Sequence, residues 1–373
     1  MPAGAVPFLA SLCTKIGGVL TAYSESLLKT IAQIAPGTEL REGLERILRG
    51  RTGALIVLGS DRTVAQMSSG GFAINTEFSA TRVRELAKMD GAIVCDKDAS
   101  TLLAAGVQLL PDPSIDTNES GTRHRTAERV AKQTGFPVIA VSASMSLISV
   151  YTEGIRYTVE DTQSLMSRAN QAIRTLDSYT ERLEQVLHQL SSLEIEANVT
   201  LRDVASTLQR MEMVRRITVE AGHYVVELGK VGRLVALQLE ELTTHDLPAT
   251  WVVLRDYLPS ETTPEELQAA VDALAQLDDK EIVDPLTIAR TAGLGEELDA
   301  PLHPHGHRLL AGIKSMPGAV ADRLVDRFDG LQSLMSASLD DLRAVEGIGE
   351  QRARVIRESL SRMAESSLLE RFM

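Results

Sequence analysis

Short apolar runs alternate with helical patterns over residues 50–160. The runs at residues 53–59, 93–95 and 137–142 have the length of strands and are apolar throughout, which indicates strands buried on both faces. Further strands are expected at residues 102–110, 146–151 and 155–159, and helices at residues 27–50, 79–88 and 121–134. Residues 61–71 are rich in turn formers, with a short strand expected at 63–66. This alternation predicts one α/β domain with a mixed, largely buried central sheet.

A heptad stripe of apolar residues follows this region. Its spacings alternate four and three through Leu165, Ala169, Ala172, Leu176, Tyr179, Leu183, Val186, Leu190 and Leu193. Such a repeat predicts one long helix that packs against partner helices, and helices of the same domain are preferred to an open coiled coil. Thr158 with Asp161 resembles a capping box that would start this helix.

The remaining pattern is mostly helical. Helices are expected at residues 200–220 and 230–242, with Gly222 and Gly229 between them, then a strand at 247–258 and a helix at 264–277. Residues 301–306 (PLHPHG) predict a flexible linker. His303, His305 and His307 alternate there, but a metal site would lack carboxylate or cysteine partners, so a linker is favoured.

Four parts of the chain are therefore expected. They are an N-terminal extension at residues 1–26, the α/β domain at 27–160, an all-α domain at 161–306 and a domain of short helices at 307–373. A length of 373 residues agrees with more than one core.

Composition narrows the classes of function. A net charge of −13 argues against a protein that coats DNA, so any DNA contact must be local. Aromatic residues make up 3% of the chain, which disfavours base stacking as a main binding mode. The two isolated cysteines, Cys13 and Cys95, suit a reducing cytoplasm. No apolar run approaches a membrane span, and residues 1–26 lack the charged start and strong apolar core of a signal peptide.

The first chemical motif is Gly121-Thr122-Arg123-His124-Arg125-Thr126, at the start of a predicted helix. A helix N-terminus is the positive end of the dipole and has free N–H groups, so basic residues there are unfavourable unless an anion binds. Free N–H groups with two guanidiniums form a grip for phosphate. An isolated Arg-x-Arg would more often be a solvated helix start.

A second motif, Asp90-Gly91-Ala92, stands at a helix-to-strand corner. Side chains at such corners often point into a cleft. Taken alone, the motif is an ordinary Asp-Gly turn.

The third motif, Val345-Glu346-Gly347-Ile348-Gly349-Glu350, lies between two predicted helices. This is the pattern of a helix-hairpin-helix, in which the glycines aim N–H groups at a DNA phosphate and the isoleucine anchors the hairpin. Arg352 and Arg354 add positive charge, and a degenerate copy lies at residues 316–320. Residues 307–373 carry equal numbers of basic and acidic side chains, so weak, salt-sensitive binding is expected.

Together, and in this order, the three motifs resemble those of the bacterial DNA integrity scanning proteins, a family of diadenylate cyclases. The resemblance covers about residues 30–370. It implies an α/β cyclase domain with a mixed central sheet, an all-α linker domain and a C-terminal helix-hairpin-helix domain. It also implies the synthesis of cyclic di-AMP from two ATP molecules with Mg²⁺ or Mn²⁺.

The resemblance assigns roles to residues. Asp90 would bind the metal and orient the ribose 3′-hydroxyl, while Arg123, His124 and Arg125 would hold the triphosphate and stabilise the leaving pyrophosphate. The implied ATP-binding positions are Gly91, Leu109, Thr122, Arg123, His124, Arg125, Thr126 and Ser142. The implied DNA-binding positions are Gly347, Ile348, Gly349, Arg352 and Arg354.

The resemblance further implies a homo-octamer with cyclase domains face to face. It also implies that the protein is cytoplasmic and associated with the nucleoid. Branched double-stranded DNA would inhibit the cyclase. Two other functions stay open: a non-catalytic DNA-repair scaffold that binds branched DNA, and a sensor that binds cyclic dinucleotide without making it.

Overall fold

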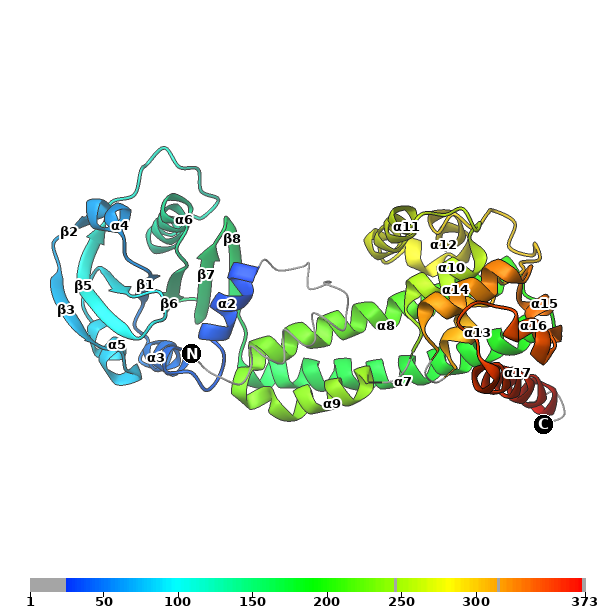
Figure 1. Cartoon of the computed structure of the whole chain (residues 1–373). Coiled ribbons are helices and arrows are strands. Elements are labelled where there is room, and N and C mark those ends of the chain that lie inside the picture. The colour runs from blue at the N-terminus through cyan, green and yellow to red at the C-terminus, as the bar shows by residue number, and fades with distance from the viewer. Residues whose placement is uncertain (1–24, 245–246, 314–315, 371–373) are drawn as a thin grey trace. The chain divides into compact units, whose positions relative to one another are not determined.

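The computed structural model describes residues 25–244, 247–313 and 316–370 (Figure 1). Nearly all of the predicted N-terminal extension, with Cys13, lies outside these ranges. The chain forms two compact units, residues 1–173 with 219–241 and residues 174–218 with 242–373. Two long helices contribute to both units, so the units cut across the domain boundaries expected from the sequence.

The first unit holds the α/β fold. Its helices before the long stretch are α2 (Glu25–Gln33), α3 (Glu39–Arg49), α4 (Arg62–Met67), α5 (Ala80–Leu86) and α6 (Thr122–Thr134). Its strands are β1 (Ala54–Leu58), β2 (Ser68–Ser69), β3 (Phe72–Glu77), β4 (Ala92–Cys95), β5 (Thr101–Leu109), β6 (Val138–Ser142), β7 (Leu147–Thr152) and β8 (Ile155–Val159).

These strands form one mixed sheet in the order β2-β5-β4-β1-β6-β7-β8, with β3 also paired to β5. β1 and β4 are parallel, and the other pairs are antiparallel. Helices α3 and α5 cover one face of the sheet, and α4 and α6 cover the other (Figure 1). Their apolar side chains join the two core clusters on these faces. Every residue of β1, β4 and β6 is buried, which confirms the predicted two-sided burial.

Residues 61–77 differ from the expectation. The predicted strand at residues 63–66 is wrong, because Asp61 accepts a hydrogen bond from the Val64 amide at 2.8 Å and caps helix α4. Strand β3 was not predicted. It is a largely exposed edge strand whose register shifts between Ala73 and Thr76, so it lacks the alternation that marks a strand.

The rest of the chain is helical. It comprises α7 (Thr162–Ile195), α8 (Leu201–Leu228), the 3-10 helix η1 (Gly229–Gly232), α9 (Arg233–Thr243), α10 (Thr250–Tyr257), α11 (Pro264–Gln276), the 3-10 helix η2 (Glu281–Val283) and α12 (Pro285–Thr291). The last five helices are α13 (His307–Ala311), α14 (Gly318–Arg327), α15 (Leu331–Ser336), α16 (Leu339–Arg343) and α17 (Glu350–Glu370). The three-part fold class expected from the sequence is thus confirmed. No helix of the described ranges is long and apolar enough to cross a membrane.

Helix α7 confirms the predicted stripe, whose members are buried or partly buried. A second column, Ile173, Thr180, Leu187 and Glu194, is buried beside it at spacings of seven. The predicted capping box is wrong, because Thr158 lies in β8 and Asp161 itself accepts from the amides of Gln163 and Ser164, both at 3.0 Å.

Two other expectations fail for reasons of packing. Helix α8 continues through Gly222, which is buried, because burial on neighbouring helices outweighs the low helix propensity of glycine. The predicted strand at residues 247–258 is helix α10. Val253, Leu254, Tyr257 and Leu258 have helical spacing and enter one core cluster, which overrides their β propensity.

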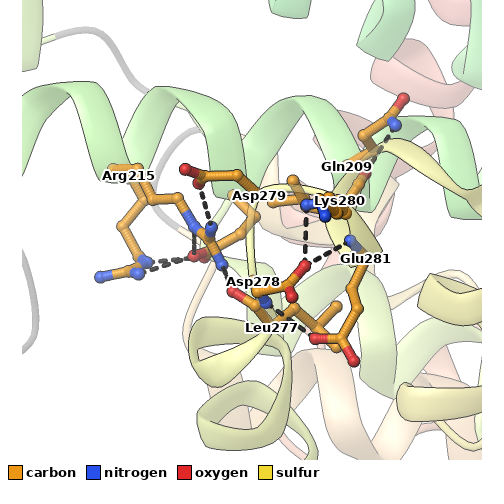
Figure 2. A network of polar contacts seen from close by, with 10 residues as sticks. Gln209, Arg215, Leu277, Asp278, Asp279, Lys280 and Glu281 are labelled. Atoms are coloured by element: carbon orange, nitrogen blue, oxygen red, sulfur yellow. Dashed lines mark hydrogen bonds and ion pairs between the residues drawn. The ribbon is translucent and has the colours of Figure 1, made fainter.

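Polar contacts tie α8 to η2 and to the loop before it (Figure 2). Gln209 donates through its amide to the carbonyls of Ile282 and Val283. Arg216 donates to the Leu277 carbonyl, and both Arg215 and Arg216 pair with Glu212. These contacts add to the apolar packing of Leu277 and Ile282, and the sequence pattern does not reveal them.

The segment 301–306 is not a free linker. The Leu302 amide donates to the Val199 carbonyl at 2.9 Å, and His305 contacts the Leu258 carbonyl through Nε2 at 3.0 Å. Asp256 of α10 is fully buried and accepts from the amides of Gly306, His307 and Arg308, at the start of α13. Burial, then the nearby Glu194, raises the pKa of Asp256 to about 6.

Candidate functional site

The residues of the α/β unit that could carry chemistry meet where the central strands β4, β1 and β6 begin or end. This end of the strands is called the site edge below. Ile56 of β1 pairs with Ile93 of β4, so Gly53 is level with Asp90 just before these strands begin. Ala54 pairs with Val141 of antiparallel β6, which places Ser142 at the same edge. Because adjacent strands are about 4.8 Å apart, Asp90, Gly53 and Ser142 follow one another along a short row.

Asp90 is exposed at this edge, on a turn that only glycine can complete. Gly91 has φ +105, and a Cβ there would lie 2.7 Å from the Gly106 carbonyl carbon and 2.9 Å from the Val107 oxygen. Gly106 itself has φ +68, where the register of β5 shifts. The close backbone approach holds the Asp90 turn against β5 and leaves its carboxylate in solvent.

Helix α6 brings the basic motif to the same edge. Its N-cap residue is Gly121, which has no side chain that could accept a hydrogen bond from the N–H groups of the first turn. The Arg123 guanidinium lies over Gly53, where a Cβ would be 2.2 Å from Nη1. The predicted grip and the predicted metal residue, far apart in sequence, are therefore neighbours along the edge.

The other predicted ATP-binding residues differ in how exposed they are. Thr122 and Arg125 are exposed and Thr126 is half-buried on α6. Ser142 is buried, and its Oγ accepts from the Met145 amide at 3.4 Å. Leu109 ends β5 at the site edge, but its side chain packs in the core on the α6 face. Contact of Leu109 with adenine stays a prediction.

His124 faces inward between the two arginines and is 7% exposed. Its Nδ1 lies 2.8 Å from the Tyr151 hydroxyl, which donates to Glu119 at 2.9 Å. Arg156 donates to the same Glu119 oxygen at 3.0 Å. Burial lowers the pKa of His124. Glu119 acts to raise this pKa, whereas Arg156 and Arg123 act to lower it. Burial therefore favours the neutral imidazole.

Sequence reasoning missed Gly53, Gly106, Glu119, Tyr151 and Arg156. Gly53 and Gly106 carry no motif of their own, since their role is to leave space for a residue that is distant in sequence. The other three are polar residues in a loop and two strands, and no spacing rule links them to His124.

The Gly53 contact makes a testable prediction. In a Gly53→Ala variant the added methyl must displace the Arg123 guanidinium, which is the flexible end of an exposed side chain. With ATP as the substrate, as the resemblance implies, we expect the KM to rise about tenfold, the loss of one charged hydrogen bond, with little change in melting temperature. Steady-state kinetics and a thermal melt check this. An unchanged KM would show that Arg123 does not act from this position.

The hairpin motif lies between α16 and α17. Gly347 has φ +86, and Ile348 is buried in the surrounding core, as expected of an anchor. Gly349 has open space around its Cα. Arg352 donates to the Gly347 carbonyl at 2.5 Å, and Arg354 pairs with Glu350 at 3.3 Å in solvent, where such a pair contributes little.

A further arginine reaches the hairpin from the degenerate copy. Arg323 of α14 lies over Gly347, where a Cβ would be 2.8 Å from Nη2. Its Nε is buried and has no hydrogen-bond partner within the described ranges. The guanidiniums of Arg323 and Arg352 thus converge on one glycine, an arrangement that suits a phosphate diester.

No group of three or more potential metal ligands occurs in the described part of the chain. Asp90 is a lone exposed carboxylate at the edge. That fits Mg²⁺ or Mn²⁺, since Mg²⁺ is commonly held by one or two carboxylates together with substrate phosphates.

Three family profiles match the chain. They are described as the DisA bacterial checkpoint controller nucleotide-binding domain (residues 41–156), the DisA bacterial checkpoint controller linker region (159–300) and the helix-hairpin-helix motif (308–369). The chain is thus a nucleotide-binding protein of the checkpoint-controller class with a helix-hairpin-helix domain.

Curated relatives agree over nearly the full length. The DNA integrity scanning protein DisA of Kineococcus radiotolerans is 57% identical, over 94% of this chain and 98% of that protein. The protein of the same name from Streptomyces coelicolor is 54% identical, over 96% and 97%. A solved structure of a DacA double mutant from Staphylococcus aureus aligns with 36% of this chain and 88% of that chain, at 22% identity and a TM-score of 0.29. The chain belongs to the DisA family of DNA integrity scanning proteins.

Proposed function

We propose that this protein is a diadenylate cyclase that condenses two ATP molecules into cyclic di-AMP and two pyrophosphates. The observation that carries the proposal is the row formed by Asp90 and the Arg123 guanidinium at one strand edge. A carboxylate for a metal beside an arginine at a helix N-terminus suits a nucleoside triphosphate.

The reaction needs positioning more than covalent help. The 3′-hydroxyl oxygen of each ATP attacks the α-phosphorus of the other, the bond to the β-phosphate breaks, and the hydroxyl proton is lost. Asp90 would hold Mg²⁺ or Mn²⁺ and orient the hydroxyl, and the metal would favour loss of its proton and neutralise phosphate charge. Arg123 and Arg125, with the hydroxyls of Thr122 and Thr126, would stabilise the leaving pyrophosphate.

One cyclase domain would hold one ATP, so two domains must meet face to face. The two-fold symmetry of the product matches an isologous pair of domains. We propose a homo-octamer in the cytoplasm, associated with the nucleoid, as the family resemblance implies.

We further propose that the hairpin binds branched double-stranded DNA and that bound DNA inhibits the cyclase. Support comes from the hairpin geometry at Gly347 and Gly349 and from the arginines around it. The backbone contact would be independent of sequence. In the full chain, Gly349→Glu places a carboxylate at the hairpin in open space, so the variant should keep cyclic di-AMP synthesis and lose this inhibition. Retained inhibition would exclude the hairpin as the regulator.

Arg323 gives the sharpest test of the DNA interface. An Arg323→Met variant keeps a side chain of similar length and removes the guanidinium that lies over Gly347. We expect affinity for a four-way DNA junction to fall several-fold and the slope of log K against log salt to fall by about one. The control is Arg327→Met, an exposed arginine one turn further along α14. Equal slopes for the Arg323 variant and the unchanged protein would reduce Arg323 to a packing residue.

A non-catalytic scaffold that binds branched DNA is the alternative function. The hairpin agrees equally well with both. The convergence of Asp90 with Arg123 favours the cyclase, because a scaffold has no use for a metal-binding carboxylate beside a phosphate grip.

A further inference from the structure

Both ring nitrogens of His124 are unavailable to a ligand at the surface. Nδ1 is occupied by the Tyr151 hydroxyl at 2.8 Å. Nε2 is buried and has no hydrogen-bond partner within the described ranges. Since the ring edge at Cδ2 faces the N-cap Gly121, the imidazole lies under the first turn of α6 rather than on it. His124 thus differs from its two neighbours in the motif, Arg123 and Arg125, which are exposed.

The hydrogen bonds of this cluster have a defined direction. Tyr151 has one hydroxyl hydrogen, and it goes to Glu119, so the Tyr151 oxygen can only accept from Nδ1. His124 is therefore the neutral tautomer with its hydrogen on Nδ1. At the other end of this series of hydrogen bonds, Arg156 donates to the same Glu119 oxygen. The pKa of Tyr151 is raised, by burial first and then by the bond to Glu119, so the hydroxyl keeps its hydrogen.

Each of the four hydrogen-bonded residues comes from a different element. Glu119 is in the loop before α6, His124 in the first turn of α6, Tyr151 in β7 and Arg156 in β8. The chain of bonds therefore connects the start of the basic helix, and the loop that leads into it, to the sheet. An unpaired Nε2 costs stability, and such costs are retained where function requires a geometry.

We propose that Tyr151, Glu119 and Arg156 are positioning residues of the phosphate grip, acting through His124. They fix the rotation of the first turn of α6, and so the directions in which Arg123 and Arg125 present their guanidiniums to the triphosphate. His124 is the anchor of the motif and does not itself bind phosphate. This inference rests on the proposed function, because it concerns the same nucleotide site.

The test measures binding of α,β-methylene ATP to the full chain by calorimetry with Mg²⁺ present. Tyr151→Phe removes the acceptor that Nδ1–H has within the described ranges, and Glu119→Gln removes the charge from the bonds that Glu119 accepts from Tyr151 and Arg156. Each is expected to weaken binding about tenfold, the loss of one buried hydrogen bond. The matched control is Glu128→Gln. Glu128 is a carboxylate of α6 that bonds to Thr117 and Lys132 and takes no part in the hydrogen bonds between His124, Tyr151, Glu119 and Arg156. It should bind within about twofold of the unchanged protein.

A double-mutant cycle separates positioning from general loosening. If Tyr151 acts by directing Arg123 and Arg125, Tyr151→Phe should weaken binding clearly less in an Arg123→Ala background than in the unchanged protein, because one of the two directed groups is then absent. Equal weakening in both backgrounds, or unchanged binding by both Tyr151→Phe and Glu119→Gln, would overturn the proposal. If the unchanged protein fails to bind the analogue, the proposed function itself is contradicted, which is a different result.

Discussion

Replacing Asp90 by asparagine is expected to lower cyclic di-AMP synthesis by roughly 10³-fold or more, because several kcal/mol of charge stabilisation through the metal would be lost. Asp90 is exposed at the sheet edge and asparagine has nearly the same volume, so stability should change by less than about 0.5 kcal/mol. Initial rates with saturating ATP and Mg²⁺ or Mn²⁺ measure the effect.

The matched control is Asp98→Asn, an exposed aspartate of the same α/β unit that lies after β4 instead of before it. It should retain full activity. Loss of one oriented charged group usually lowers the rate by more than about tenfold. If Asp90→Asn kept more than about a tenth of the rate, another residue would have to hold the metal.

Replacing Arg308 by methionine is expected to destabilise the second unit by about 3–5 kcal/mol, since it leaves a buried charge without its partner. Arg308 of α13 pairs with Glu194, whose side chain is fully buried at the end of α7. Tyr257 also donates to Glu194, at 2.5 Å, and would be the main partner left. Urea unfolding followed by fluorescence reports on this unit alone, because the only tryptophan of the chain, Trp251, lies on α10.

The double variant Arg308→Met with Glu194→Met should recover much of the loss, because two apolar side chains can replace a buried ion pair at little cost. A double variant no more stable than Arg308→Met alone would contradict this account. The loss would then come from the hydrogen bond of Arg308 to Ser191 or from packing.

Strands β1, β4 and β6 were predictable because their apolar runs are buried on both faces. The α7 stripe was predictable because one helix face repeats every seven residues. Helix α10 was not, since its residues have strand propensity and only the core against which they pack selects the helix. The segment 301–306 was also misjudged. Its composition indicates a linker, whereas the buried Asp256 that holds its end is fifty residues away in sequence.

The site shows the same division. Asp90 and the basic residues of α6 carry local motifs, so the sequence identified them. Their proximity depends on strand register, with Ile56 beside Ile93 and Ala54 beside Val141, which no motif encodes. The inward turn of His124 toward Tyr151 likewise depends on the sheet below the helix. The sequence therefore indicated the groups, and the structure shows which of their side chains are exposed and which one is buried.

The central claim is that the purified full chain makes cyclic di-AMP. The most direct measurement incubates it with ATP and Mg²⁺ or Mn²⁺ and follows the products by liquid chromatography and mass spectrometry. The account predicts cyclic di-AMP with two pyrophosphates for each product molecule, dependent on the added metal. A folded protein that binds branched DNA but forms no cyclic di-AMP with either metal would contradict the account and leave the scaffold function in its place.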